Sequence, residues 1–304
     1  MFRILYSIYF LKFPVEVVDK YYDKITCKLL ILILPLYFKL TRKSLSLNER
    51  RDNKNIIISL TTFPKRIHKV WLTIESIIRQ TSRPDKIILW LYKDEFRGKE
   101  SLPTRLLNLE KFGLEIRFCD ENLKPHKKYY YTLIEFPNSD VITIDDDIIY
   151  PNNLIEKYLI NNAKYPKAIL CFIGRKINIS KRQFIEPYES WNYLKNNTVP
   201  SYNILPIGVG SIYYPANSLH EEVLNIEKIK SFALNADDLW LKIMSIKNQT
   251  KVVNLGREYT RFFIPILNKN DQKLMDSNIS EGKNDLIFHK LTNIYNISLK
   301  QFVD

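Results

Sequence analysis

The chain is organised around the stretch Val141-Ile142-Thr143-Ile144-Asp145-Asp146-Asp147-Ile148-Ile149-Tyr150-Pro151. Its β-branched first part is typical of a buried strand in an α/β sheet. Three carboxylates at the end of such a strand are costly unless a positive charge offsets them. In an extended chain Asp145 and Asp147 point the same way, because side chains alternate with a period of two. The pattern therefore predicts a site for Mg²⁺ or Mn²⁺, completed by phosphate oxygens.

The alternative interpretation of this stretch is an acidic turn in which an aspartate caps the following helix. That interpretation suits a lone pair of aspartates. Here three acids stand between apolar residues on both sides, which favours the metal site.

The composition describes an ordinary globular chain with a strong positive charge. The 304 residues are 45% apolar and 26% charged, with a formal net charge of +13 and a pI of about 9.4. The charge favours an anionic partner, such as a phosphorylated substrate or an anionic membrane surface. We expect no nucleic acid partner, because no zinc-finger, RNA-recognition or helix-turn-helix signature occurs. Cys27, Cys119 and Cys171 have no metal or redox spacing, which fits a reducing, cytosolic setting.

Residues 1–50 differ in composition from the rest of the chain. The run from Leu29 to Phe38 is apolar and contains Pro35, and basic residues flank it on both sides. This run is too short to span a bilayer as a helix, which needs about 20 residues. Either it lies on an anionic membrane surface, or it forms a buried helical hairpin packed on the catalytic domain. The coincidence of apolar runs with cations favours the membrane surface.

Strands and helices alternate from residue 51 onward. The patterns predict strands at 55–62, 85–92, 114–118, 141–144, 168–172 and 252–253, and helices at 70–79, about 102–112, 129–136, 154–162, from 237, and in the polar tail from 269. Such alternation predicts a largely parallel sheet with right-handed crossovers. Ligands bind at the carboxyl ends of strands in such sheets, where the loop after Thr62 lies. Residues 174–204 show no clear period, and long stretches of that kind are often substrate-binding regions.

In their order along the chain, several motifs resemble those of bacterial glycosyltransferases with the GT-A fold, of the family-2-like capsule and surface-polysaccharide type. The motifs are Ser59–Arg66, Lys86–Trp90, Lys127-Lys128, Ile144–Asp147, Pro206–Gly210 and Ala236–Trp240. The resemblance covers about residues 55–290. It implies an α/β GT-A (nucleotide-diphospho-sugar transferase) fold with a nucleotide-binding half at 51–151 and an acceptor-binding half with C-terminal helices at 152–304. Residues 1–50 lie outside it, as an N-terminal helical, membrane-associating segment.

The resemblance also implies a nucleotide-sugar donor, a UDP- or GDP-sugar, and Mn²⁺ or Mg²⁺ as cofactor. Asp145 and Asp147 match the family's Asp-x-Asp motif. One of them, or Asp146, would contact the donor ribose, and Asp147 would bind the metal. A metal across the two phosphates stabilises the negative charge that grows on the leaving nucleoside diphosphate.

Further donor contacts are implied at the strand ends. Thr61, Thr62 and Arg66 stand where the family binds the nucleotide base. Lys127 or Lys128 would contact the phosphates, or lie near the base or ribose. The alternatives are a surface charge for the arginine and solvated residues at a helix start for the lysines.

The acceptor side is implied by a glycine loop and an acidic pair. Gly208 and Gly210 match the segment beneath the two sugars, where small residues let the backbone approach a ligand. Asp237 and Asp238 match the acidic pair of inverting members, in which one carboxylate, aligned with Asp238, deprotonates the acceptor hydroxyl. A helix N-cap is the alternative for this pair. His289 is a candidate third metal ligand, with a surface or core histidine as its alternative.

We therefore expect an inverting enzyme that transfers a single sugar to a polysaccharide or polyprenyl-pyrophosphate-linked glycan. It would lie in the cytoplasm, peripheral to the inner face of the bacterial plasma membrane. No Gln-x-x-Arg-Trp segment follows the acidic pair, which argues against a processive synthase. A retaining transferase, an inactive glycan- or partner-binding homologue and a nucleotidyltransferase remain as alternatives. In the irregular region, Tyr188 and Trp191 are candidates for stacking on a sugar.

Overall fold

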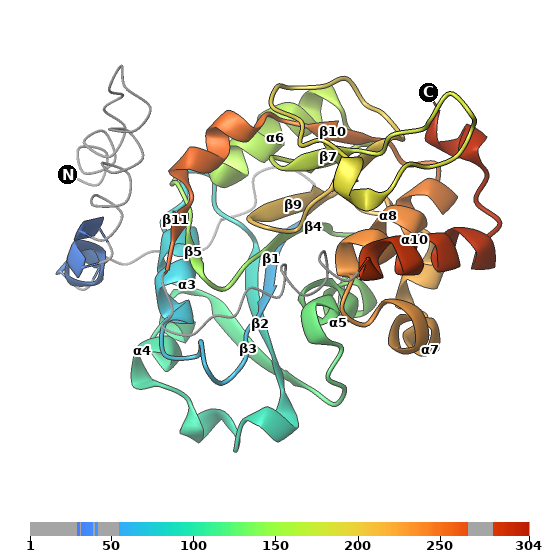
Figure 1. The fold of residues 1–304 in the computed structure, drawn as a ribbon. Helices are drawn as coiled ribbons and strands as arrows, with labels where there is room; N and C mark the ends of the chain where they lie inside the picture. The colour runs from blue at the N-terminus through green and yellow to red at the C-terminus, as the bar shows by residue number, and fades with distance from the viewer. Residues whose placement is uncertain (1–28, 31, 39, 42–54, 267–281, 304) are drawn as a thin grey trace.

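The computed structural model describes residues 29–30, 32–38, 40–41, 55–266 and 282–303. Its centre is a seven-stranded sheet in the spatial order β10-β6-β9-β4-β1-β2-β3 (Figure 1). The strands of this sheet are β1 (Ile56–Thr61), β2 (Lys86–Tyr92), β3 (Leu114–Cys119), β4 (Asp140–Ile144), β6 (Ile169–Cys171), β9 (Ser211–Tyr214) and β10 (Val252–Asn254). Two small pairs join β5 (Ile148–Ile149) to β11 (Ile264–Pro265) and β7 (Gly174–Lys176) to β8 (Ile204–Pro206).

The central sheet is mostly parallel, as the alternation of elements predicts. β1 runs parallel to β2 and β4, with Ser59 opposite Thr143 and Thr61 opposite Trp90. β2 runs parallel to β3, and β6 to β10. Only β9 in this sheet runs the other way, between β4 and β6. The carboxyl ends of all the other strands therefore meet at one edge, where α/β sheets bind their ligands.

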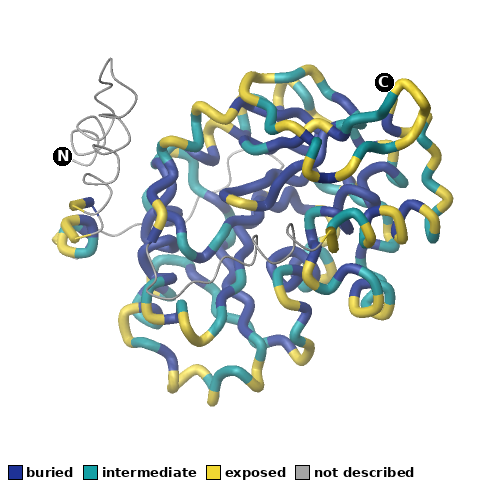
Figure 2. Tube along the Cα trace, viewed as in Figure 1, coloured by how far each residue is buried: buried dark blue, intermediate teal, exposed yellow. Residues whose placement is uncertain are grey.

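Both faces of the sheet are covered, which explains why its strands read as continuous apolar runs (Figure 2). Along β1, Ile56, Ile58 and Leu60 pack into the core on one face, while Ile57 faces the opposite side. The helices are α3 (Val70–Ile78), α4 (Thr104–Leu107), α5 (Lys127–Glu135), α6 (Leu154–Lys164), α7 (Ile226–Lys228), α8 (Asp237–Lys247) and α10 (Lys283–Ile294). The buried apolar side chains form two main cores. Residues of α3, α4 and α6 pack with Ile58 and Leu60 in the first core, and residues of α5, α8 and α10 pack in the second core.

Two sequence-based assignments differ from the structure, and a third stretch, 205–215, for which no element was assigned, forms strands. The helix expected at about 102–112 is divided into α4 and a 3₁₀ turn at Glu110–Phe112, which ends where Gly113 takes a φ of +95°. The stretch 205–215 forms two strands in different sheets, with the glycine loop between them. The region 174–204 is not structureless, because β7 and β8 lie at its two ends and pair with each other.

The two predicted halves of the catalytic domain share one sheet. Residues 51–151 supply β1 to β4, and residues 152–304 supply β6, β9 and β10. The predicted boundary at residue 51 and the start of the tail at residue 269 lie outside the described residues. Near the N-terminus, Leu30, Leu34 and Phe38 are buried in the first core. No helix in the described part of the chain is both long enough and apolar enough to cross a membrane.

Candidate active site

Three segments that are far apart in the sequence meet at the carboxyl edge of the sheet. They are the turn after β4, the loop between β8 and β9, and the first turn of α8. Gly210 N–H donates to Asp145 Oδ2 at 2.9 Å, and Gly208 N–H donates to Asp238 Oδ1 at 2.9 Å. One glycine loop therefore holds a carboxylate from each of the two acidic segments.

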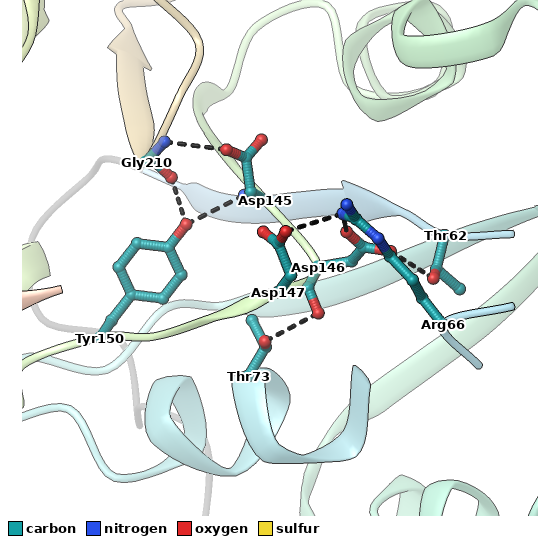
Figure 3. A network of polar contacts seen from close by, with 8 residues as sticks. All are labelled: Thr62, Arg66, Thr73, Asp145, Asp146, Asp147, Tyr150 and Gly210. Atoms are coloured by element: carbon teal, nitrogen blue, oxygen red, sulfur yellow. Dashed lines mark hydrogen bonds and ion pairs between the residues drawn. The ribbon is translucent and has the colours of Figure 1, made fainter. Parts of the chain in front are cut away.

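The acidic segment after β4 is a turn into β5 rather than an extended strand end. Arg66 Nη1 lies 2.7 Å from Asp146 Oδ1 and 2.9 Å from Asp147 Oδ2. The Thr62 hydroxyl donates to the other oxygen of Asp146 (Figure 3). The alternation of an extended chain therefore does not apply: Asp146 and Asp147 share one arginine, while Asp145 faces the glycine loop.

Asp145 carries a carboxyl group whose ionised form is poorly compensated. Burial raises the pKa of Asp145 to about 7, with Lys128 opposing the shift and Asp147 adding to it. Its backbone N–H donates to the hydroxyl of Tyr150 at 2.9 Å, and that hydroxyl donates in turn to the Gly210 carbonyl oxygen (Figure 3). The turn and the glycine loop are thus joined by backbone as well as side-chain contacts.

The glycines of the loop are required by close approach. A β-carbon on Gly208 would lie 2.7 Å from Asp238 Oδ1 and 2.9 Å from Lys128 Nζ. Gly210 has a φ of +101°, and a β-carbon there would lie 2.8 Å from the Phe263 ring. Any larger residue at these positions would displace the groups that surround the site.

The second acidic segment begins α8. One of its carboxylates, Asp237, forms an ion pair, and the other, Asp238, does not share that pair's close contact. Lys128 Nζ, from the first turn of α5, lies 2.9 Å from Asp237 Oδ2. Burial alone would raise the pKa of Asp237, but Lys128 and His126 lower it below its usual value. Burial and the charge of Asp237 raise the pKa of Asp238 to about 7. Burial opposes the charge on Lys128, yet the carboxylates around it raise its pKa above the usual range.

Other predicted site residues lie apart from this constellation. The Thr61 hydroxyl donates to the Trp90 carbonyl oxygen at 2.9 Å, a contact that joins β1 to β2. Lys127 is buried, and its Nζ donates to Asn122 Oδ1 at 2.8 Å. His289 is exposed on α10.

The predicted metal-ligand set is only partly assembled. Across the described residues, no group of three histidine, cysteine, aspartate or glutamate side chains is arranged to hold a metal ion. The structure therefore does not bring His289 together with Asp145 and Asp147 as a third ligand. The two aspartates remain the candidate ligands on the protein.

The aromatic residues expected to stack on a sugar belong to the protein core instead. Trp191 is 1% exposed, and its indole N–H donates to the Glu186 carbonyl oxygen at 2.8 Å. Tyr188 is also buried and packs on Trp191, with ring centroids 5.1 Å apart. Arg175 lies over the Tyr188 ring, with its guanidinium carbon 4.4 Å from the ring centroid.

Sequence reasoning did not identify two residues that shape the site. Tyr150 bridges the acidic turn and the glycine loop, and the Thr73 hydroxyl on α3 donates to the Asp146 carbonyl oxygen at 3.0 Å. Tyr150 directly follows the apolar pair after the three aspartates, and this closeness in sequence could have marked it as a residue of the site. Thr73 lies on α3, whose residues are all buried, and a buried hydroxyl needs a partner.

Comparison with solved structures shows a weak similarity in fold. No known protein family matches the sequence, and no curated protein matches it either. Among solved structures, the fold is similar to 4-diphosphocytidyl-2C-methyl-D-erythritol synthase from Anaerococcus prevotii DSM 20548, with a TM-score of 0.44 and 15% sequence identity. The similarity covers 76% of this chain and 100% of that chain.

Proposed function

We propose that this protein is a metal-dependent glycosyltransferase that moves a sugar from a UDP- or GDP-sugar to a glycan or polyprenyl-pyrophosphate-linked acceptor. The observation that carries the proposal is the glycine loop, which binds Asp145 through Gly210 and Asp238 through Gly208. One acidic segment suits the diphosphate of a donor, and the other suits the hydroxyl group of an acceptor. The loop would then run beneath the sugar that passes between them.

The acidic turn fits a divalent cation. Asp146 and Asp147 share the charge of Arg66, and burial, with Asp147 adding to it and Lys128 opposing it, raises the pKa of Asp145 to about 7. Such a surplus of buried negative charge is relieved by a hard cation with oxygen ligands. Asp145 and Asp147 would hold Mn²⁺ or Mg²⁺, and the donor phosphates would complete its shell. When bound, the metal neutralises charge on the departing diphosphate.

Asp238 is the proposed general base. A base works best when its pKa lies near the operating pH, and the pKa of Asp238 is about 7. Its carboxylate would take the proton of the acceptor hydroxyl while that oxygen bonds to the anomeric carbon. The bond from that carbon to the diphosphate oxygen breaks at the same time, so the anomeric configuration inverts. The Gly208 N–H fixes one oxygen of Asp238 and leaves the other for the acceptor.

Lys128 and Asp237 are proposed as a positioning pair rather than as groups that contact the donor. The ammonium and carboxylate lie 2.9 Å apart, and both side chains are largely buried. Because Asp237 keeps its negative charge through this pairing, it raises the pKa of the neighbouring Asp238. The pair thus sets both the orientation of the helix start and the basicity of the proposed base.

A thermal-shift panel of nucleotide sugars, each with and without Mn²⁺, tests the proposed function. The expected result is that one UDP- or GDP-sugar raises the melting temperature by roughly 5 °C, and only when the metal is present. Stabilisation without metal would remove the metal from the proposal. The absence of any shift with every donor would contradict the proposal as a whole. The anomeric configuration of the product, measured by NMR, separates inversion from retention.

A further inference from the structure

The helical residues between positions 29 and 40 have two apolar faces. Leu30, Leu34 and Phe38 are buried in the core of the domain. The other face is exposed to solvent, by 50% for Leu29, 74% for Leu32, 43% for Ile33, 59% for Leu36 and 75% for Leu40. The segment lies at the rim of the molecule (Figure 1). A contiguous row of exposed aliphatic side chains is typical of an interaction surface.

Arg79, at the end of α3, fixes this helix to the catalytic domain. Its Nη2 donates to the Phe38 carbonyl oxygen at 3.0 Å, and its Nη1 donates to Thr41 Oγ1 at 3.0 Å. The guanidinium carbon also lies 4.9 Å above the centre of the Phe38 ring. The same helix α3 contacts the acidic turn, because Thr73 Oγ1 donates to the Asp146 carbonyl oxygen. The helix that carries the exposed face is therefore connected through α3 to the candidate active site.

The charge around this helix is entirely positive in the sequence. From residue 25 to residue 48 no aspartate or glutamate occurs. In the sequence, the basic residues of this window are Lys28, Lys39, Arg42 and Lys43. Aliphatic side chains together with cations are the combination that binds the headgroup region of an anionic bilayer.

Two other occupants suit this surface less well. A second copy of the chain in a two-fold dimer would bring these basic segments close to each other, and like charges oppose that contact. A protein partner is favoured by exposed tryptophan, tyrosine and arginine, whereas the exposed residues here are leucine and isoleucine.

We propose that the exposed face of residues 29–40 docks the catalytic domain on an anionic phospholipid surface. The helix is then neither a loose anchor nor a purely buried hairpin, because one face packs on the domain and the other enters the lipid interface. This docking stands independently of the reaction. The further conclusion that the acceptor is carried by a lipid rests on the proposed function.

Vesicle flotation of the full chain tests the docking. The vesicles contain phosphatidylcholine alone or phosphatidylcholine with phosphatidylglycerol, at low and high salt. We expect the wild type to float with the anionic vesicles and to be partly released by salt. The double variant L32S/L36S is expected to lower the partition coefficient by roughly a hundredfold. The matched control is L286S, which changes a leucine on α10 that is 71% exposed, and it should float like the wild type.

Each outcome has a defined meaning. The docking is overturned if the wild type fails to float, if L32S/L36S floats as well as the wild type, or if L286S loses as much binding as the double variant. A concentration-dependent dimer in gel filtration that L32S/L36S abolishes would assign the face to a second copy. Donor binding by L32S/L36S, measured in solution, should equal that of the wild type. A failure of the docking is thus distinguished from a failure of the proposed function.

Discussion

The two acidic segments of the candidate site are built from the same residue type but are compensated differently. In the turn after β4, Asp146 and Asp147 face Arg66, while burial, with Asp147 adding to it, raises the pKa of Asp145. At the start of α8, two aspartates face Lys128, and the less compensated group is Asp238. The first arrangement is the one that we propose to bind a divalent cation. The second leaves one carboxylate with a pKa near neutrality, which suits proton transfer.

The largest effect is expected from a substitution that impairs only the acceptor side of the site. In Asp238→Asn the amide oxygen can still accept the Gly208 N–H, but the side chain no longer takes a proton. Turnover should fall by roughly 10²–10⁴-fold, while donor binding should stay near the wild-type value. Steady-state kinetics and calorimetry on the same sample measure both. A near-native rate would assign the base to Asp237 or point to retention.

The next largest effect is expected when the lysine on the acceptor side of the site is replaced. Lys128→Met leaves Asp237 buried without its partner and should cost about 3 kcal/mol of unfolding free energy. The matched control is Lys127→Met, which removes a hydrogen bond to Asn122 and should cost about 1 kcal/mol. Urea denaturation of the two variants provides the comparison. Equal losses would show that the Lys128–Asp237 pair has no special place in the site.

The pH dependence of the reaction rate tests the role of Asp238 as the base. The pKa of Asp238 is raised to about 7, and only its ionised form accepts a proton. At limiting substrate, kcat/KM should therefore fall about tenfold for each pH unit below 7 and level off above it. A rate profile that stays flat down to pH 4 would contradict the assignment of Asp238 as base.

The smallest expected effect concerns the link between the two segments. Tyr150→Phe removes the hydroxyl that accepts the Asp145 N–H and donates to the Gly210 carbonyl oxygen. Because these groups are buried, the unfolding free energy should fall by about 1 kcal/mol. Thermal denaturation measures the loss. An unchanged stability would mean that the hydrogen bonds made directly between Asp145 and Gly210 are enough to hold the glycine loop to the turn.

The order of strands and helices was largely predictable from the sequence because local apolar patterns determine it. The central strand, the first helix and the start of α8 lie within a few residues of the expected positions. The position of Asp145 at the carboxyl edge follows from the direction of β4, which the alternation of elements also predicts. The glycine loop lies at the same edge because β9 runs antiparallel to β4, and β8 and β9 were not predicted.

The partners of individual side chains were not predictable in the same way. Nothing in the local sequence distinguishes Lys127, which contacts Asn122, from Lys128, which contacts Asp237. Their contacts differ because α5 directs Lys128 toward α8 and Lys127 toward the loop before α5. Trp191 was expected to meet a sugar, yet the core formed by α8 and α10 buries it. These contacts depend on tertiary packing, which a pattern along one chain does not encode.

Calorimetric titration of the identified nucleotide sugar, in the presence of Mn²⁺, into wild type, Asp147→Ala and Asp238→Asn tests the division of the site most directly. We expect Asp147→Ala to abolish metal-dependent donor binding and Asp238→Asn to bind the donor like the wild type. Unchanged binding by Asp147→Ala, or loss of binding in Asp238→Asn, would contradict the assignment of the acidic turn to the donor and of the α8 pair to the acceptor.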